Sequence, residues 1–145
     1  MGTVKVVRLE DTGCEAHGYA NPTFEGDSGP LHGRQEVRTY FEGTESSPFL
    51  IEVRAGADKP TISHAHRVDE IVYILDGELR IGKHTYGPGS AILVPGDTLY
   101  SFHVGPEGVR YLNFRPRRDD SYVTAEQFMA ERRARHEAVE VASPD

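Results

Sequence analysis

Three side chains between residues 64 and 70, in the sequence HAHRVDE, have the types and spacing of a metal-ligand set. His64, His66 and Glu70 are separated by even numbers of residues. On an extended strand, whose side chains alternate between two faces, all three therefore point the same way. Two imidazoles and a carboxylate that converge leave open coordination positions and suit divalent iron, manganese, nickel or zinc. The alternative is a polar strand face in water, which a short HxH motif alone favours.

The residues that follow Glu70 indicate that this carboxylate is buried. Residues 71–77, IVYILDG, form an apolar, β-branched run that closes on a turn, as expected of a core strand. A polar group buried without a partner costs about 2 to 7 kcal/mol. Three such groups together imply a shared partner, and a metal ion is the simplest one.

A second glycine-bracketed strand lies further along the chain. Residues 87–97, GPGSAILVPGD, open with glycine and proline, continue through an apolar stretch, and close with Pro95, Gly96 and Asp97. The sequence therefore predicts two glycine-bracketed strands that flank a hairpin.

These segments resemble the two sequence motifs of the cupin superfamily. The first motif consists of a glycine, a spacer, HxH, a glutamate and a second glycine. Here it is matched by Gly56, His64, His66, Glu70 and Gly77, with a spacer after Gly56 that is two residues longer than usual. The resemblance covers roughly residues 48–115. It implies an all-β fold, an antiparallel double-stranded β-helix or jelly-roll barrel, with a metal pocket inside and, in this chain, a C-terminal helix after the barrel.

The second motif is matched in part. Gly89 and Pro95 have the family's spacing, but Asp97 stands at the place of the next glycine, which has moved to Gly96. Tyr100 stands where the family has its fourth ligand, a histidine. The site is therefore expected to have three ligands and an open question at the fourth position.

Two residues compete for that fourth position. In the expected strand 98–104, alternation places Tyr100 inward and His103 outward, and the turn GPEG at residues 105–108 follows at the family's distance from Tyr100. A β-bulge, which adds one residue and re-aims side chains, would instead bring His103 to the metal. A phenol titrates near pH 10, so Tyr100 is expected to position substrate or polarise an oxygen rather than to ligate the metal. Filling the barrel is the alternative role for Tyr100.

Length and composition favour one domain of the all-β class. The chain has 145 residues, and its 15 glycines and 9 prolines punctuate short apolar runs. We divide it into an N-terminal strand and arm over residues 1–33, a barrel over 34–118, and a C-terminal helix and tail over 119–145. The lone Cys14 excludes an intramolecular disulfide.

Strands are expected at residues 3–10, 36–41, 49–54 and 109–114, with a long loop at 13–33. Thr124 and Gln127 form a capping-box pattern that predicts the start of a helix. We expect the apolar stripe of that helix to pack on the domain surface and the chain to fray from Val139 onward.

The charge balance argues against polyanionic partners. The formal net charge is −7, which disfavours nucleic acid and anionic membranes and leaves a small molecule as the expected ligand. No N-terminal apolar stretch has the length of a signal peptide or membrane span, so a cytoplasmic location is expected. The cupin resemblance implies a homodimer.

These observations predict a metal-dependent enzyme that acts on a small organic molecule. The favoured reaction is that of a mononuclear non-haem iron-type dioxygenase, because a facial triad with vacant positions is how such iron activates dioxygen. The predicted ligands are His64, His66, Glu70 and, by the bulge route, His103, with Tyr100 as the catalytic residue. A redox-neutral cyclase, isomerase or lyase, and a non-catalytic small-molecule-binding cupin, are the alternatives.

Overall fold

One antiparallel β-sheet dominates the structure, a computed structural model that describes residues 2–17, 35–57 and 62–142. The sheet has seven strands in the order β1-β2-β3-β8-β5-β6, and β7 pairs with β5. The strands are β1 (Cys14–His17), β2 (Gln35–Phe41), β3 (Phe49–Ala55), β5 (Glu70–Ile81), β6 (His84–Tyr86), β7 (Ala91–Val94) and β8 (His103–Arg115). The all-β fold class expected from the sequence is confirmed.

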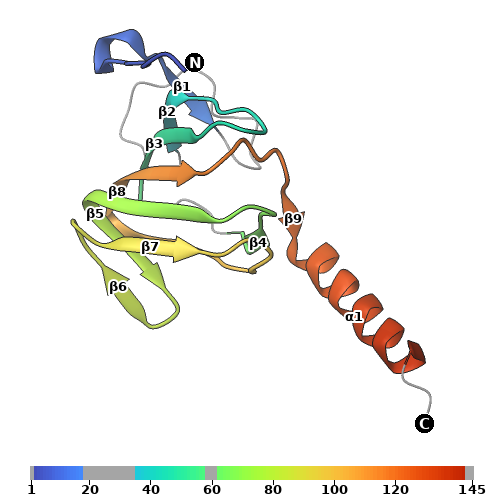
Figure 1. The fold of residues 1–145 in the computed structure, drawn as a ribbon. Coiled ribbons are helices and arrows are strands. Elements are labelled where there is room, and N and C mark those ends of the chain that lie inside the picture. Colours follow the sequence, from blue (N-terminus) through green and yellow to red (C-terminus); the bar gives the residue numbers. More distant parts are fainter. Residues whose placement is uncertain (1, 18–34, 58–61, 143–145) are drawn as a thin grey trace.

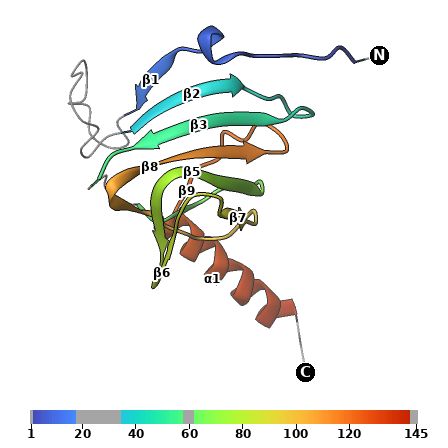
Figure 2. The ribbon, with the colours of Figure 1, turned by 90° about the vertical axis from the view of Figure 1, so that its left-hand side faces the viewer.

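The sheet curves around an interior, as Figures 1 and 2 show from two sides. The long strands β5 and β8 pair along most of their length, but their register shifts between Ile74 and Asp76 and again between Gly77 and Leu79. Such bulges increase the local twist and bend the strands. The bend changes the direction of the second half of β5, the part next to β6, and gives the sheet its concave face (Figure 2).

The core lies on that concave face. Val72 and Ile74 alternate with exposed residues on β5 and pack with Leu79, Ala55 and Val109. The alternation is the period-2 pattern of a strand with one face buried. Glu70 has the same parity as Val72 and Ile74, so its carboxylate also points into the interior.

A short two-stranded sheet brings the histidine segment to the C-terminal helix. Strand β4 (His64–Ala65) pairs with β9 (Val123–Thr124), and α1 (Ala125–Ala142) follows directly. The predicted capping box is present: the Gln127 amide N–H donates to Thr124 Oγ1 at 3.2 Å, and the Thr124 amide N–H donates to Gln127 Oε1 at 3.1 Å.

The expectation that α1 packs on the domain surface is wrong. The helix points away from the sheet (Figure 1), and its apolar residues Met129, Val139 and Val141 are 45%, 65% and 84% exposed. It also continues in regular form beyond Val139 to Ala142. Only its first turns lie against β4 and β9, because β9 ends at the rim of the barrel. Within the described ranges no helix combines the length and apolarity needed to cross a membrane.

Other expected elements differ in position. Residues 3–8 are extended but unpaired, and Leu9–Asp11 form a 3-10 helix in place of the expected strand. Cys14–His17 form β1, and the rest of the expected loop, residues 18–33, lies outside the described residues. The expected turn at 105–108 belongs to β8, because the bulges let the strand bend through Gly108 without reversing. Of the expected strand 98–104, Tyr100 forms an isolated bridge, and His103 and Val104 begin β8.

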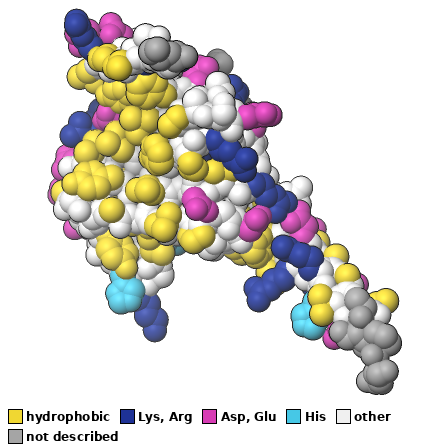
Figure 3. All heavy atoms as spheres, in the orientation of Figure 1, with side chains coloured by type: hydrophobic (Ala, Val, Ile, Leu, Met, Phe, Trp, Pro, Cys, Tyr) yellow, Lys and Arg dark blue, Asp and Glu magenta, His cyan; other side chains and the backbone are white. Residues whose placement is uncertain are grey.

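The convex face of the sheet carries an apolar surface, which Figure 3 shows over β5, β7 and β8. Ile71 pairs with both Leu93 and Phe114, and all three side chains are more than a third exposed, as is Tyr73. Contiguous exposed apolar surface is typical of interaction sites. The homodimer expected from the sequence stays a prediction.

The bend at Gly77 supplies a test of the fold. Gly77 has φ +75, and a Cβ there would collide with the backbone of Gly108. We expect Gly77→Ala to lower the free energy of unfolding by roughly 2 kcal/mol or more, because strain and collision add. Gly87 has no atom within 4 Å of a built Cβ, so Gly87→Ala should change it by less than about 0.5 kcal/mol. Urea unfolding of both variants measures the difference, and equal effects would contradict the described bend.

Candidate active site

A cavity of about 560 Å³ opens inside the curved sheet. The inward faces of β2, β3 and β8 supply apolar walls, and residues 118–122 border the polar end. The polar side chains that line it include His64, His66, Glu70, Tyr100, Asn113 and Arg115. A cavity of this size, with apolar walls and converging polar groups, is typical of a small-molecule site.

Strand pairing brings Glu70, Asn113 and Arg115 together. Val72 on β5 pairs with Asn113 on β8, so these residues share the inward face, and Glu70 and Arg115 lie two residues further along their antiparallel strands. On the other side of β8, Arg115 pairs with Phe49 of β3, and its guanidinium carbon lies 5.3 Å from the centre of the Phe49 ring.

These side chains form a hydrogen-bonded cluster around the Glu70 carboxylate. Glu70 Oε2 accepts from Asn113 Nδ2 at 2.8 Å and from Arg115 Nη2 at 3.3 Å. The same Arg115 Nη2 lies 3.3 Å from His66 Nε2. The side chains of Glu70 and Arg115 are 1% and 12% exposed, so the ion pair is buried. Arg115 thus lies between the glutamate and one of the two histidines.

Both histidines are held by their Nδ1 atoms. His66 Nδ1 lies 2.6 Å from the Ser121 carbonyl oxygen, and His64 Nδ1 lies 2.9 Å from the Ile62 carbonyl oxygen. A carbonyl only accepts, so each neutral ring carries its proton on Nδ1 and its lone pair on Nε2. Each imidazole therefore presents a proton-accepting nitrogen away from the backbone.

The environment keeps the phenol and one imidazole neutral. Burial, followed by the positive charge of Arg115, lowers the pKa of His66. Burial, followed by the negative charge of Glu70, raises the pKa of Tyr100 far above its ordinary value. Tyr100 is therefore a hydrogen-bond donor at neutral pH and not a phenolate.

The structure brings Tyr100, and not His103, to the cavity. Tyr100 forms an isolated backbone bridge with His64, with N···O distances of 3.1 and 3.0 Å, which sets its side chain beside the histidine. Its ring centre lies 4.7 Å from that of His64. His103 is exposed on β8, paired with Arg80, and lies outside the cavity lining. The bulge that would aim His103 inward is therefore not present at this position.

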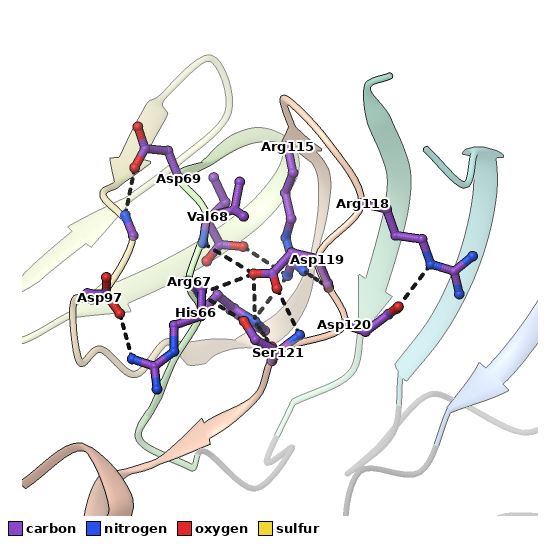
Figure 4. A network of polar contacts seen from close by, with 12 residues as sticks. His66, Arg67, Val68, Asp69, Asp97, Arg115, Arg118, Asp119, Asp120 and Ser121 are labelled. Atoms are coloured by element: carbon purple, nitrogen blue, oxygen red, sulfur yellow. Dashed lines mark hydrogen bonds and ion pairs between the residues drawn. The ribbon is translucent and has the colours of Figure 1, made fainter. Parts of the chain in front are cut away.

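Residues 119–122 border the polar end of the cavity, and Figure 4 shows the polar contacts of Asp119 and Ser121 there. Asp119 Oδ2 accepts from the amides of Arg67 and Val68 at 3.1 and 3.2 Å, and its Oδ1 accepts from the Ser121 amide at 2.8 Å. Tyr122 stacks on His64 with 4.7 Å between ring centres. This segment therefore fixes the backbone that follows His66 and the ring of His64.

Arg67 ties the same region to the C-terminal helix. Its guanidinium donates to both carboxylate oxygens of Glu131 on α1, at 2.7 and 2.9 Å, and to Asp97 Oδ1 at 2.7 Å. The Asp97 contact is visible in Figure 4. The orientation of α1 is thus linked to the residue next to His66.

The site fits a metal in donor type but not in placement. The Nδ1 contacts of both histidines are those that orient metal ligands, and Glu70 Oε1 is buried without a hydrogen-bond partner. However, Arg115 lies against both His66 and Glu70. Among the residues that the structure describes, no three His, Cys, Asp or Glu side chains form a group that could hold a metal ion. Metal binding stays a prediction, and it would require Arg115 to move.

Comparison with solved structures identifies the architecture. The polyketide cyclase RemF from Streptomyces resistomycificus matches over 85% of this chain and 86% of its own, with a TM-score of 0.63 and 19% identity. An RmlC-like cupin protein from Ralstonia eutropha JMP134 matches over 94% and 88%, with a TM-score of 0.62 and 13% identity. This chain has the cupin fold.

A cupin-2 domain from Rhodospirillum rubrum also matches, over 92% of this chain and 89% of its own, with a TM-score of 0.55 and 17% identity. No family model and no curated protein matches the chain by sequence. The cupin fold predicted from the two motifs is confirmed. Sequence identities this low do not indicate which reaction a protein catalyses, so the chemistry must be argued from the site.

Sequence reasoning missed several residues of this cupin site. Asn113 and Arg115 are separated from Tyr111 by even numbers of residues in the final barrel strand. This alternation was the signal that could have placed all three on one face of the strand. Asp119, Ser121 and Tyr122 carried no such signal, because they reach the site from an irregular segment that local patterns do not position.

The buried carboxylate of Asp119 provides a test of how the polar end is held. Its side chain is 6% exposed and accepts from three backbone amides. We expect Asp119→Ala to lower the free energy of unfolding by about 2 kcal/mol, because a buried carboxylate that accepts three hydrogen bonds is removed and the partly buried Val68 and Ser121 amides lose their acceptor. The neighbouring Asp120 is 79% exposed and pairs with Arg118, so Asp120→Ala should have an effect within about 0.5 kcal/mol. Urea unfolding compares the two, and a small effect of Asp119→Ala would contradict the described contacts.

Proposed function

We propose that this chain is an enzyme that catalyses a redox-neutral proton transfer on a small, largely apolar molecule with a carbonyl or phenolic oxygen, as a cyclase or isomerase does. The observation that carries the proposal is the buried Arg115 guanidinium between His66 Nε2 and Glu70 Oε2, at 3.3 Å from each. A fixed positive charge that is largely buried from water stabilises negative charge that develops on a substrate oxygen.

The other polar groups have complementary roles in this proposal. His64 presents the Nε2 lone pair and acts as the base that removes a proton from carbon next to the carbonyl group. Tyr100, kept neutral by burial, donates a hydrogen bond to the substrate oxygen. His66, Glu70 and Asn113 hold Arg115 in place, because its Nη2 is shared by the imidazole and the carboxylate. The proton taken by His64 returns to another atom of the substrate, so no oxidant is needed.

The cavity walls support a planar, mostly apolar substrate. Phe49, Phe102, Tyr111 and Tyr122 line the cavity with aromatic surface, and aromatic rings favour stacked or edge contacts with other rings. The structural likeness to a polyketide cyclase is consistent with this class of molecule, and at 19% identity it adds only analogy.

A metal-dependent dioxygenase, the reaction favoured by the sequence, is the second candidate. The specific observation in its favour is that His64 and His66 both place Nδ1 on a backbone carbonyl, as metal-bound histidines do. The two candidates differ in what happens to the substrate's mass. Proton transfer leaves the mass unchanged or removes water, whereas a dioxygenase adds oxygen atoms.

Turnover of aromatic β-diketones and phenols, in air and without oxygen, separates the candidates. We expect products of unchanged mass or with one water lost, formed equally with and without oxygen, as measured by liquid chromatography and mass spectrometry. Products that gain oxygen and form only in air would contradict the proposal.

The roles of individual residues are tested with the substrate that this panel yields. His64→Ala should lower kcat/KM by roughly 10²- to 10⁴-fold, because the base is lost. Tyr100→Phe should lower it by about tenfold, as expected for one hydrogen bond to a developing charge. His103→Ala is the matched control and should leave kcat/KM unchanged, since His103 is exposed outside the cavity. An unchanged kcat/KM in His64→Ala would rule out its role as the base.

A further inference from the structure

We propose that the Arg115 guanidinium takes the place of a divalent metal ion in this pocket, so that the site uses a fixed side-chain cation and rejects metal. This inference goes beyond the proposed reaction, because it concerns what the site is made of and holds for any small molecule that the cavity binds. It rests on the position of Arg115, on the contacts that hold Arg115 there, and on the hydrogen bonds that the Glu70 carboxylate already accepts.

The position of Arg115 conflicts with a metal ion on the same side chains. Metal bonds to imidazole nitrogen and carboxylate oxygen are about 2.0 to 2.2 Å long. Arg115 Nη2 is 3.3 Å from His66 Nε2 and 3.3 Å from Glu70 Oε2. An ion bonded to either atom would therefore lie within about 5.5 Å of Nη2. Two cations this close in a buried site repel each other strongly.

Arg115 is held in this position from several sides. Its Nη1 donates to the Asp119 carbonyl oxygen at 3.2 Å, and its guanidinium lies over the Phe49 ring. Its side chain is 12% exposed. Movement into solvent would break these contacts and would leave the buried Glu70 carboxylate without its counter-charge, which is strongly unfavourable. The guanidinium is therefore a fixed part of the site.

The carboxylate that would bind a metal already has partners. Glu70 Oε2 accepts from both Asn113 and Arg115. Tyr100, which forms a backbone bridge with His64, stands where the cupin motif has a histidine. Of the four expected ligand positions, two, His66 and Glu70, are thus in contact with Arg115, and one has tyrosine in place of histidine.

The two histidines keep the orientation of metal ligands, and this makes the inference testable. If Arg115 alone excludes the ion, its removal should leave His64, His66 and Glu70 around a vacated space. Arg115→Met, which has similar bulk without charge, should then gain metal affinity. Arg115→Lys, which keeps the charge, should not.

Titration of metal-stripped, tag-free protein with Co²⁺ tests this directly, because bound Co²⁺ gives visible absorption bands that do not depend on activity. We expect no saturable binding of Co²⁺ to wild type. Arg115→Met should bind one Co²⁺ per chain, with an affinity at least about tenfold above that of any residual binding to wild type. His66→Ala in the Arg115→Met background should abolish the gain. Arg118→Met is the matched control, since Arg118 also lines the cavity but is half exposed and pairs with Asp120.

The inference is overturned if wild type binds one Co²⁺ saturably and His66→Ala abolishes that binding. It is also overturned if Arg115→Met, shown to be folded by its near-ultraviolet circular dichroism, gains no affinity. Should Arg115→Met fail to fold, the wild-type and Arg115→Lys titrations still decide, because binding to either contradicts the inference. No substrate enters this experiment, so its failure is distinct from a failure of the proposed reaction.

Discussion

The buried ion pair of Glu70 and Arg115 is the interaction on which the rest of the site depends. Neither charge could stay in this interior alone, because the cost of removing an ion from water is recovered only through a close partner and further hydrogen bonds. The antiparallel pairing of β5 and β8 supplies that partner by placing both residues on the inward face. Through Arg115 the pair then contacts His66 and the carbonyl oxygen of Asp119, and so joins the barrel wall to the segment that closes the cavity.

The cupin fold provides this chain with a curved sheet and an interior cavity, and the chain's own residues decide the chemistry there. A tyrosine at the fourth ligand position and a guanidinium between His66 and Glu70 replace positive charge from a metal with positive charge from a side chain. Both can stabilise an oxyanion. Only the metal can also bind dioxygen, and for this reason the identity of the cation separates the two proposed reactions.

Much of the fold could be predicted because its signals are local. Strands at 36–41 and 49–54 follow from apolar alternation, and the inward direction of Glu70 and Tyr100 follows from parity. The helix start follows from Thr124 and Gln127. The direction of α1 could not be predicted, because it depends on where β9 ends and on the long-range contact of Arg67 with Glu131. The role of Arg115 could not be predicted for a similar reason. A charged residue at the end of a strand is expected to face solvent, and only the strand register shows which carboxylate lies beside it.

The account's central claim is that a guanidinium, and not a metal ion, lies between His66 and Glu70. A crystal structure of tag-free protein, produced in medium that contains iron, manganese, nickel and zinc, tests it through anomalous scattering near each metal's absorption edge. We expect no anomalous peak at this position and clear density for the Arg115 guanidinium in contact with both side chains. An anomalous peak bonded to His64, His66 and Glu70, with Arg115 displaced, would contradict the account.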